Sequence, residues 1–395
     1  MEMEASFERN TKPRQDDHPA ASLFTDDLIL EILSRLPARS VHRFKCVSVP
    51  WRDLITDPAN RNKLPQILAG FLYMTVSENG RGHHFASVSS DGAAAPFDPS
   101  LPCLHDHDKD EGIIQVNSCN GLLLYHRYKK DNVTPLMKED DLRFVVCNPV
   151  TQRRVELPPL PPKSVADRSS RTTGLAFDPP ISPDFHVLHF EQTFQEKYIT
   201  GVNIYSSRTG AWSHRGNEIA EKVMLFFGSR CIFVGGMLYL MGSLERNHGH
   251  HLLLGLDMKG KVWRTISLPY GGRFGAIGSS QGCLHYAVAF FDDNNQISRL
   301  ELWCLQDCNS KELVLKHIAS FNKLMSMTGK AYMAVEIHPD CVTIFLVSCG
   351  GDTLVAYDMR HQKIRYILNF EKSNTQRFLP YVPLFSESLA DADRR

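Results

Sequence analysis

The sequence predicts an α+β multidomain chain, in which a small three-helix unit precedes an all-β propeller of six blades. Residues 23–63 carry helical signals, whereas residues 65–385 form a series of short β-rich runs separated by Gly, Pro, Asn and Asp. The β-rich part repeats with a period of about fifty residues, which is typical of propeller blades. The length of 395 residues exceeds one ordinary domain and indicates about two or three.

Composition excludes several classes of function. The 44 Lys and Arg residues balance 44 Asp and Glu residues, so no overall field attracts nucleic acid or an anionic membrane. No apolar run reaches the roughly 18 residues that span a bilayer, and the first residues lack the apolar core of a secretory signal. We therefore expect no nucleic-acid or membrane partner, and a location in the cytoplasm, the nucleus or both. We also expect a disordered tail over residues 1–22 and a further tail over residues 386–395.

The helical unit shows a start and a stop signal for each helix. Thr25 can cap the first helix, and Asp26 and Asp27 suit its positive end. Apolar residues then follow at helical spacing up to Pro37: Leu28, Ile32, Leu33 and Leu36. Ser40 can cap a second helix, and Pro50 suits the first turn of a third. Three helices of this length make a small core, which indicates that a partner completes it.

Three blocks in this unit resemble the F-box, in the form common among plant F-box proteins. The blocks are Leu28–Pro37, Ser40–Ser48 and Trp51–Ile55, and the chain departs from the family pattern at Thr25 and at the pair Val49–Pro50. The resemblance implies docking onto the Skp-type adaptor of a Skp–cullin–F-box ubiquitin ligase, and through it onto a cullin scaffold. The implied adaptor contacts are Leu28, Ile32, Leu33, Leu36, Pro37, Val41, Phe44, Val47 and Trp51. The alternative is a helical hairpin packed on the body of the protein.

In the body, an apolar strand that ends in a turn recurs. The equivalent positions are Asn148, Ser206, Asp257, Gln306 and Asp358, which lie at intervals of 58, 51, 49 and 52 residues. This period, with about four short strands in each unit, is typical of kelch-like propeller blades. Each blade buries its faces only against its neighbours, so the ring has to close to be stable.

Six runs are predicted as the innermost strands of the blades: Ile67–Val76, Gly112–Cys119, Thr172–Phe177, Arg230–Val234, Phe274–Ser279 and Tyr332–Ile337. A further run, Leu379–Phe385, is predicted to complete the first blade and clasp the ring. The irregular unit over residues 65–111 leaves seven blades as the alternative count. The body resembles the F-box-associated domain of plant F-box proteins, a galactose-oxidase/kelch-like propeller; Cys119–Leu124 and Cys147–Thr151 carry that likeness best.

Several other clusters suggest chemistry but have a simpler interpretation. Cys103–Asp108 and His248–His251 contain metal-ligand residue types, yet they lie in polar segments that read as solvated loops. Gly271–Gly278 lacks the Lys-Ser/Thr pair and the helix of a phosphate loop. Most of the ten cysteines lie in apolar runs, where a thiol behaves as a small buried hydrophobe. We expect no catalytic residue, no metal site and no cofactor.

Two classes of function are compatible with these features. One is a non-catalytic ligase subunit, whose F-box binds the adaptor and whose propeller binds a target protein for ubiquitination; an F-box protein acting outside the ligase is a variant of it. The other is a galactose-oxidase-like metalloenzyme, because fold alone does not determine function. An F-box ahead of the propeller favours the first class.

The target is predicted to dock on the face where the connections between second and third strands emerge. These connections are long and varied in charge, whereas the turns between third and fourth strands are short, and long loops on a rigid scaffold are where binding tends to occur. The candidate target-binding residues are Glu191, Phe194, Glu196, His248, His250, His251, Phe291, Asp292 and Asp293. The alternative is that these loops are tolerated insertions.

Overall fold

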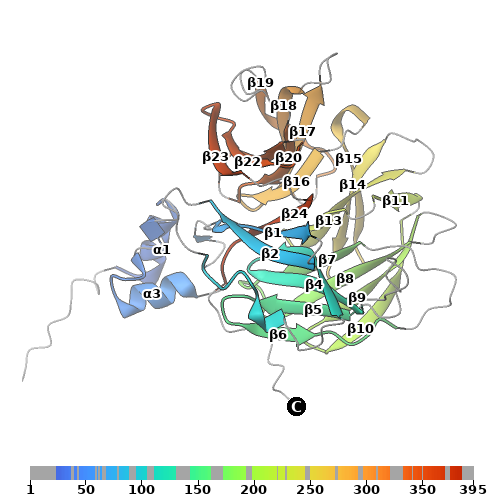
Figure 1. Ribbon diagram of the computed structural model, residues 1–395, viewed down its shortest axis with the longest axis horizontal. Coiled ribbons are helices and arrows are strands. Elements are labelled where there is room, and N and C mark those ends of the chain that lie inside the picture. The colour runs from blue at the N-terminus through green and yellow to red at the C-terminus, as the bar shows by residue number, and fades with distance from the viewer. Residues whose placement is uncertain are drawn as a thin grey trace, which may run out of the picture.

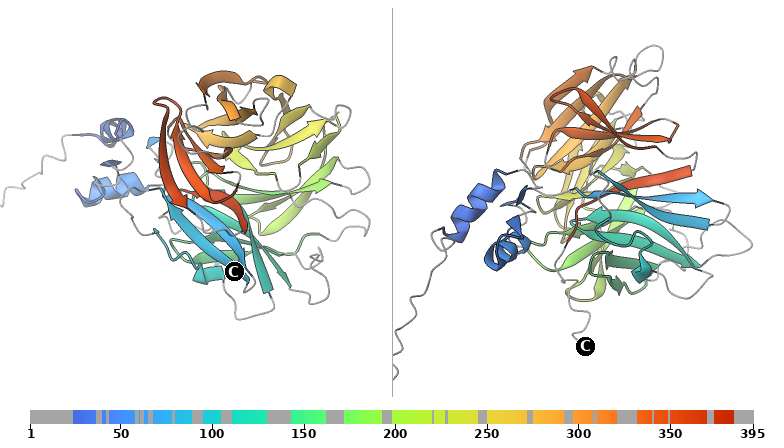
Figure 2. Two further views of the ribbon diagram at one scale, coloured as in Figure 1. Left: turned by 45° about the horizontal axis from the view of Figure 1, so that its top comes forward. Right: turned by 60° about the vertical axis from the view of Figure 1, so that its left-hand side comes forward.

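The structure is a computed structural model of the chain. It describes residues 24–36, 40–41, 44–57, 60, 63–64, 68–77, 80–88, 95–104, 111–129, 143–161, 172–192, 198–219, 221–226, 229–244, 250–271, 275–291, 297–307, 310–320, 332–339, 341–348, 350–369 and 374–384. A small helical unit lies to one side of a ring of sheets (Figures 1 and 2).

The helical unit contains two described helices rather than the three expected. Helix α1 spans Asp26–Ser34 and α3 spans Val49–Thr56. In the second predicted helix, Ser40, Val41 and Phe44 are helical, whereas residues 45–47 form a turn. The predicted cap of α1 is confirmed, because the Leu28 N–H donates to Thr25 Oγ1 at 3.4 Å. Helix α3 begins one residue earlier than expected, since Ser48 is its cap and Pro50 lies in its first turn.

In the described part of the chain, the strands form six sheets, which confirms the expected six-blade propeller. The first sheet holds β1 (Gly70–Ser77), β2 (Gly80–Ser87) and β24 (Asn374–Tyr381). The second holds β3 (Glu111–Cys119), β4 (Leu122–Lys129), β5 (Arg143–Asn148) and β6 (Arg153–Glu156). The third holds β7 (Thr173–Phe177), β8 (Phe185–Gln192), β9 (Ile199–Ser206) and β10 (Ala211–Gly216).

The other three sheets follow the same antiparallel order. The fourth holds β11 (Val223–Leu225), β12 (Ile232–Val234), β13 (Met237–Leu244), β14 (His251–Asp257) and β15 (Trp263–Ser267). The fifth holds β16 (Gly275–Ser280), β17 (Cys283–Phe291), β18 (Ile297–Leu305) and β19 (Val314–Ser320). The sixth holds β20 (Tyr332–Ile337), β21 (Thr343–Ser348), β22 (Thr353–Asp358) and β23 (Lys363–Asn369).

The ring is closed by β24, which is the innermost strand of the first sheet. Strand β24 pairs with β1 and contacts the inner strands β3 and β20 on either side. The predicted clasp therefore exists, but it lies over Asn374–Tyr381 rather than Leu379–Phe385. The run predicted as Ile67–Val76 forms β1, which is the second strand of its blade and not the inner one. Pairing with a segment some 300 positions away along the chain decides this position, and local sequence carries no signal of it.

The repeat found in the sequence marks the end of the third strand in five blades. Strands β5, β9, β14 and β22 end at Asn148, Ser206, Asp257 and Asp358, and Gln306 follows β18 directly. The acidic and amide side chains here fold the next turn: Asp257 Oδ1 accepts the Lys261 N–H at 2.7 Å, and Asp358 Oδ1 accepts the Arg360 N–H at 2.9 Å.

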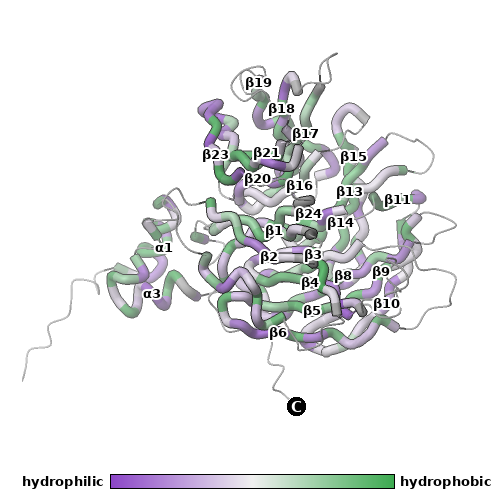
Figure 3. Tube along the Cα trace, viewed as in Figure 1, coloured by the Kyte–Doolittle hydropathy of each residue, from purple (hydrophilic) through white to green (hydrophobic). Residues whose placement is uncertain are grey.

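The core of the propeller lies between neighbouring sheets. Hydrophobic residues concentrate in the strands of the ring (Figure 3). A cluster between the first and second blades includes Leu72 of β1, Tyr125 of β4 and Tyr381 of β24. Its members also include Leu101 and Leu104, which flank or belong to the short 3-10 helix η3 (Pro102–Leu104). This segment therefore packs into the seam where the ring closes.

Stability is expected to fall as the pH drops from about 6.5 to about 4, because of His338, which is half-buried. Burial, with a smaller contribution from the charge of Arg365, lowers the pKa of His338 to about 4. Between these pH values the unfolded chain binds a proton at His338 and the folded chain does not. The contribution of His338 to the free energy of unfolding is therefore complete above pH 6.5 and is lost as the pH falls. One such group gives a slope of up to about 1.4 kcal/mol per pH unit.

Chemical denaturation at several pH values measures this effect. The variant His338→Gln keeps a planar polar side chain and cannot titrate, so its unfolding free energy is expected to depend less on pH between 4 and 6.5. An unchanged slope in His338→Gln would exclude His338 as a source of the pH dependence.

Candidate functional site

Helix α1 is apolar on both of its faces, which is unusual for a surface helix. Ile29, Leu30 and Leu33 point into the small core of the helical unit. Leu28 and Ile32, four residues apart and therefore on one face, are 46% and 45% exposed. A soluble chain rarely leaves neighbouring large apolar side chains in water unless another surface covers them.

Other exposed apolar side chains of the helical unit are Phe24, Val47 and Val49. Val49 stands where the family usually has a polar residue, so this chain adds apolar area at that position. The polar Glu31–Arg35 ion pair on α1 joins Glu31 Oε1 to Arg35 Nε at 3.2 Å. Apolar area with polar side chains around it is the usual composition of a protein–protein interface. We call Leu28 and Ile32, the exposed apolar pair on α1, the α1 surface.

The structure divides the nine predicted adaptor contacts into groups. Leu28, Ile32 and Val47 are exposed, whereas Leu36, Phe44 and Trp51 are half-buried, and Pro37 lies outside the described residues. Leu33 and Val41 are buried in the core of the unit, so they are not available for direct contact. The same period of apolar residues marks both the core and the exposed face, which is why the sequence could not separate them.

The propeller has two faces that differ in their connections. Successive strands of each four-stranded sheet run in opposite directions, so alternate connections lie at the same end of the strands. The connection between the second and third strands and the link to the next blade therefore lie on the same face. We call this the loop face. The helical unit enters β1 at the opposite face, because Gly70 pairs with Tyr381 at the end of the inner strand β24. The α1 surface and the loop face therefore belong to opposite ends of the blades.

Most of the candidate target-binding residues lie outside the described residues: Phe194, Glu196, His248, Asp292 and Asp293, with the side chain of Phe291. His250 is exposed on the loop face, and His251 is half-buried with its ring 4.7 Å from the ring of Phe226.

Glu191 requires a correction, because it is buried and not available to a target. Only 6% of Glu191 is exposed, and its carboxylate accepts from the Asn203 amide while His214 Nε2 lies 3.0 Å from Glu191 Oε2. Asn203 and His214 come from the two neighbouring strands β9 and β10, so the pairing of the sheet and not the loop position fixes Glu191.

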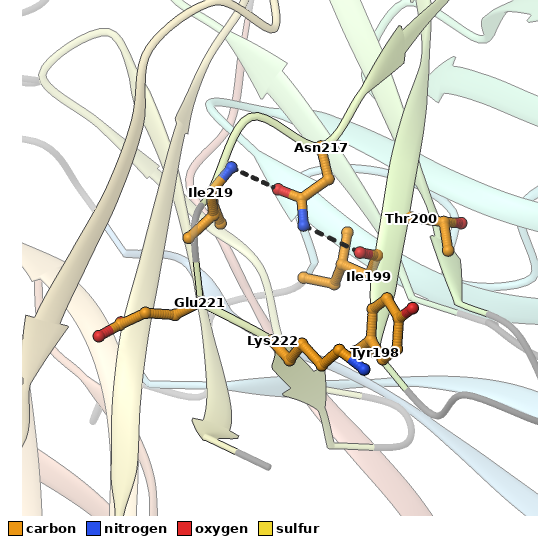
Figure 4. A pocket seen from close by; sticks show the side chains of 7 residues that line it. All are labelled: Tyr198, Ile199, Thr200, Asn217, Ile219, Glu221 and Lys222. Carbon is orange, nitrogen blue, oxygen red and sulfur yellow. Dashed lines mark hydrogen bonds between the residues drawn. The ribbon is translucent and has the colours of Figure 1, made fainter. Parts of the chain in front are cut away.

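A cavity of about 300 Å³ opens on the loop face between the third and fourth blades (Figure 4). Its lining comes from the start of β9 and from the link between β10 and β11: Tyr198, Ile199, Thr200, Asn217, Ile219, Glu221 and Lys222. Asn217 holds the link in place, because its Nδ2 donates to the Ile199 carbonyl and its Oδ1 accepts the Ile219 N–H, both at 2.9 Å. Lys222 Nζ lies 4.4 Å from the centroid of the Tyr198 ring. Sequence reasoning placed Glu191, Phe194 and Glu196 on this face but did not identify the linking segment.

Polar side chains also cross the axis of the ring. Arg230, in the interruption between β11 and β12, places Nη2 2.5 Å from Glu336 Oε2 on β20 in the sixth blade. Burial raises the pKa of Glu336, and the Arg230 charge acts against that rise. Asn117 on β3 donates to the Cys231 carbonyl at 2.9 Å and so joins the second blade to the fourth. The sequence contained one signal of this contact, because Glu336 is a charged residue within the otherwise apolar strand Tyr332–Ile337. Its partner Arg230 lies 106 residues away, so the sequence did not identify the pair.

Comparison with known proteins agrees with this arrangement of a helical unit and a propeller. The F-box domain family matches residues 22–63, and the family described as "F-box protein At3g26010-like, beta-propeller" matches residues 99–385. The chain belongs to this family of F-box proteins. The two matches together cover both the α1 surface and the loop face.

Similar F-box proteins come from Arabidopsis thaliana. F-box protein At5g49610 is 28% identical over 279 residues, which cover 67% of this chain and 70% of that protein. Putative F-box protein At3g52320 is 26% identical over 62% of this chain and 60% of that protein. F-box protein At2g23160 is 24% identical over 74% of this chain and 99% of that protein.

The described residues of this F-box protein contain no group of three or more His, Cys, Asp or Glu side chains that could hold a metal ion. Residues 105–108 of the Cys103–Asp108 cluster, residues 248–249 of the His248–His251 cluster and residues 272–274 of the glycine-rich run lie outside the described part. Among the described helices, none is long and apolar enough to cross a membrane.

Proposed function

We propose that this F-box protein is the substrate-recognition subunit of a Skp–cullin–F-box ubiquitin ligase. The α1 surface binds the Skp-type adaptor, and through it a cullin, while the propeller binds a target protein for ubiquitination. The observation that supports this role most strongly is the second apolar face of α1, where Leu28 and Ile32 are exposed beside a complete core. The role places the chain in the cytoplasm, the nucleus or both.

The arrangement of the two units suits a bridging role. Leu64 belongs to the core of the helical unit, and Leu68 packs in the propeller core four residues later. The link between the units is therefore short, and the target would be held on the far side of the blades from the adaptor. In this role the chain contributes positions and surfaces, and the chemistry of ubiquitin transfer is supplied by the other ligase components.

The target docks on the loop face, with the cavity at Tyr198 and Lys222 as part of its binding surface. The cavity is lined by an aromatic ring, an ammonium group and a carboxylate held by a fixed backbone. Aromatic side chains on a rigid support are frequent anchors at protein interfaces.

Lys222→Glu combined with Tyr198→Ala is expected to reduce target capture at least tenfold while changing the melting temperature little. Lys222 is exposed and Tyr198 is half-buried, and neither belongs to the adjoining core cluster, so their loss is expected to remove contacts to the target more than core packing. Lys261→Glu is the matched control, because Lys261 is an equally exposed lysine in a turn on the opposite face. Equal loss of capture in both variants would show that net charge, and not the cavity, determines binding.

Affinity purification with the proteasome blocked tests the whole proposal. The full-length chain is compared with its Leu28→Asp/Ile32→Asp variant, in which the propeller is intact. Proteins recovered with both are candidate targets, and proteins recovered only with the unaltered chain are expected to be the Skp-type adaptor and a cullin. Recovery of targets without adaptor or cullin would instead indicate an F-box protein that acts outside the ligase.

A further inference from the structure

Two thiols meet in the seam where the propeller closes. Cys103 lies in η3 and Cys147 lies near the end of β5, and Arg154, which pairs with Cys147 across β5 and β6, donates to the Cys103 carbonyl at 2.9 Å. Both cysteines are free, and both pack in the cluster between the first and second blades. The two thiols therefore lie in one cluster, although one comes from a short helix and the other from a strand of the second blade.

The surroundings give the two thiols different reactivity. Cys147 is fully buried, whereas Cys103 is partly exposed and can be reached from solvent. The hydrogen bond from Cys147 lowers the pKa of Cys103, and the positive charge of Arg154 lowers it further. The hydrogen bond to Cys103, together with burial, raises the pKa of Cys147. Cys103 is thus the sulfur that more readily becomes a thiolate, which is the reactive form.

The neighbouring groups hold the pair in this arrangement. Arg154 on β6 donates from Nη1 to the Cys103 carbonyl at 2.9 Å, and Arg127 on β4 donates from Nη2 to the Leu104 carbonyl at 2.8 Å. Two arginines of the second blade therefore fix η3 against that blade. Burial, and then the two nearby thiols, raise the pKa of Tyr125, so its hydroxyl stays protonated beside them.

We propose that Cys103 and Cys147 are a reversible dithiol–disulfide pair that is oxidised by hydroperoxides. The Cys103 thiolate attacks the peroxide O–O bond, forming Cys103 sulfenic acid and releasing an alkoxide or hydroxide that takes up a proton. The Cys147 sulfur then attacks the Cys103 sulfur, a disulfide forms, and the sulfenic oxygen leaves as water with the Cys147 proton. A dithiol reductant returns both residues to thiols.

Oxidation ties the η3 segment to β5 beside the closing seam. The cluster that holds both cysteines also contains Leu72 of β1 and Tyr381 of β24, the two strands that join the beginning and the end of the ring. A crosslink here limits the freedom of the unfolded chain, so the oxidised protein is expected to melt at a higher temperature. This chemistry is separate from the α1 surface and the loop face.

The chain contains an internal comparison for this pair. Cys283 and Cys304 lie on the neighbouring strands β17 and β18 and are also close to each other. Burial raises the pKa of Cys304 to about 11, so its thiolate is scarce. Cys46 and Cys341 are exposed cysteines. Their oxidation measures how far hydrogen peroxide oxidises any exposed thiol.

Titration of the full-length chain with hydrogen peroxide, followed by alkylation and non-reducing peptide mass spectrometry, tests the proposal. The peptide linked through Cys103 and Cys147 is expected to appear first, to disappear with dithiothreitol, and to accompany a rise in melting temperature. Cys147→Ser is expected to accumulate a dimedone-reactive sulfenic acid on Cys103, whereas Cys103→Ser is expected to show none on Cys147.

Three outcomes would overturn the proposal. These are oxidation confined to Cys46 and Cys341, earlier linkage of Cys283 to Cys304, or no linkage between Cys103 and Cys147 in the unaltered chain. Because the linkage is measured on the unaltered protein, poor folding of a variant does not affect the result.

Discussion

Replacing Leu28 and Ile32 together with Asp is expected to weaken binding of a Skp-type adaptor by 100-fold or more. Each large apolar side chain that an interface covers contributes about 1.5–3 kcal/mol, and about 1.4 kcal/mol corresponds to a factor of ten in affinity. The introduced carboxylates add a cost, because the adaptor would bury them without partners. Isothermal titration calorimetry with the purified full-length chain and adaptor measures the change.

The matched control is Ile181→Asp, which places the same charge on an exposed isoleucine in the propeller. It is expected to leave adaptor affinity unchanged. The double variant should keep its melting temperature, since Leu28 and Ile32 are outside the core of the helical unit. Adaptor affinity that is unaltered in Leu28→Asp/Ile32→Asp would move the interface away from α1.

Arg230→Met is expected to lower the free energy of unfolding by about 3–5 kcal/mol, because it leaves the Glu336 carboxylate buried without its partner. Part of this cost is relieved by protonation of Glu336, whose pKa burial already raises. The loss should therefore be smaller at pH 5 than at pH 8. Urea denaturation at both pH values measures the difference.

A second substitution separates the charge from the packing of the arginine. In the Arg230→Met background, Glu336→Gln removes the unpaired charge and is expected to recover part of the lost stability. If Glu336→Gln lowers stability further, or if Arg230→Met costs less than 1 kcal/mol, the pair is not a structural link across the axis.

The sequence was sufficient for those parts of the fold that local patterns determine. Thr25 caps α1 as expected, because a cap depends on residues within one turn. The repeat from Asn148 to Asp358 falls at the ends of third strands, since each blade needs the same turn at the same place. Five of the six runs predicted as innermost strands correspond to β3, β7, β12, β16 and β20, because each blade repeats the same local pattern.

Features that depend on distant pairing were missed. Pairing with β1 determines where β24 lies, and β24 begins with polar residues that do not predict a strand. Glu191 looked like an exposed loop carboxylate, but its partners on β9 and β10 bury it. The contact between Arg230 and Glu336 joins two blades, and the cluster that holds Cys103 and Cys147 joins η3 to β5, so spacing along the chain indicates neither.

The sequence also could not divide the apolar residues of the helical unit between core and surface. Leu28 and Leu33 are both leucines at helical spacing, yet one is exposed and the other is completely buried. Their difference depends on where Val41 and Leu64 pack against α1. Only the arrangement of the segments in space determines which face remains for a partner.

The most direct test of the account is ubiquitin transfer to a captured target in a reconstituted reaction. The full-length chain is combined with a Skp-type adaptor, a cullin scaffold, the ubiquitin-charging enzymes and a target recovered by affinity purification. The account predicts ubiquitination of the target with the unaltered chain, and loss of it with both Leu28→Asp/Ile32→Asp and Lys222→Glu/Tyr198→Ala. Equal ubiquitination in the absence of the chain, or with both variants, would contradict the account.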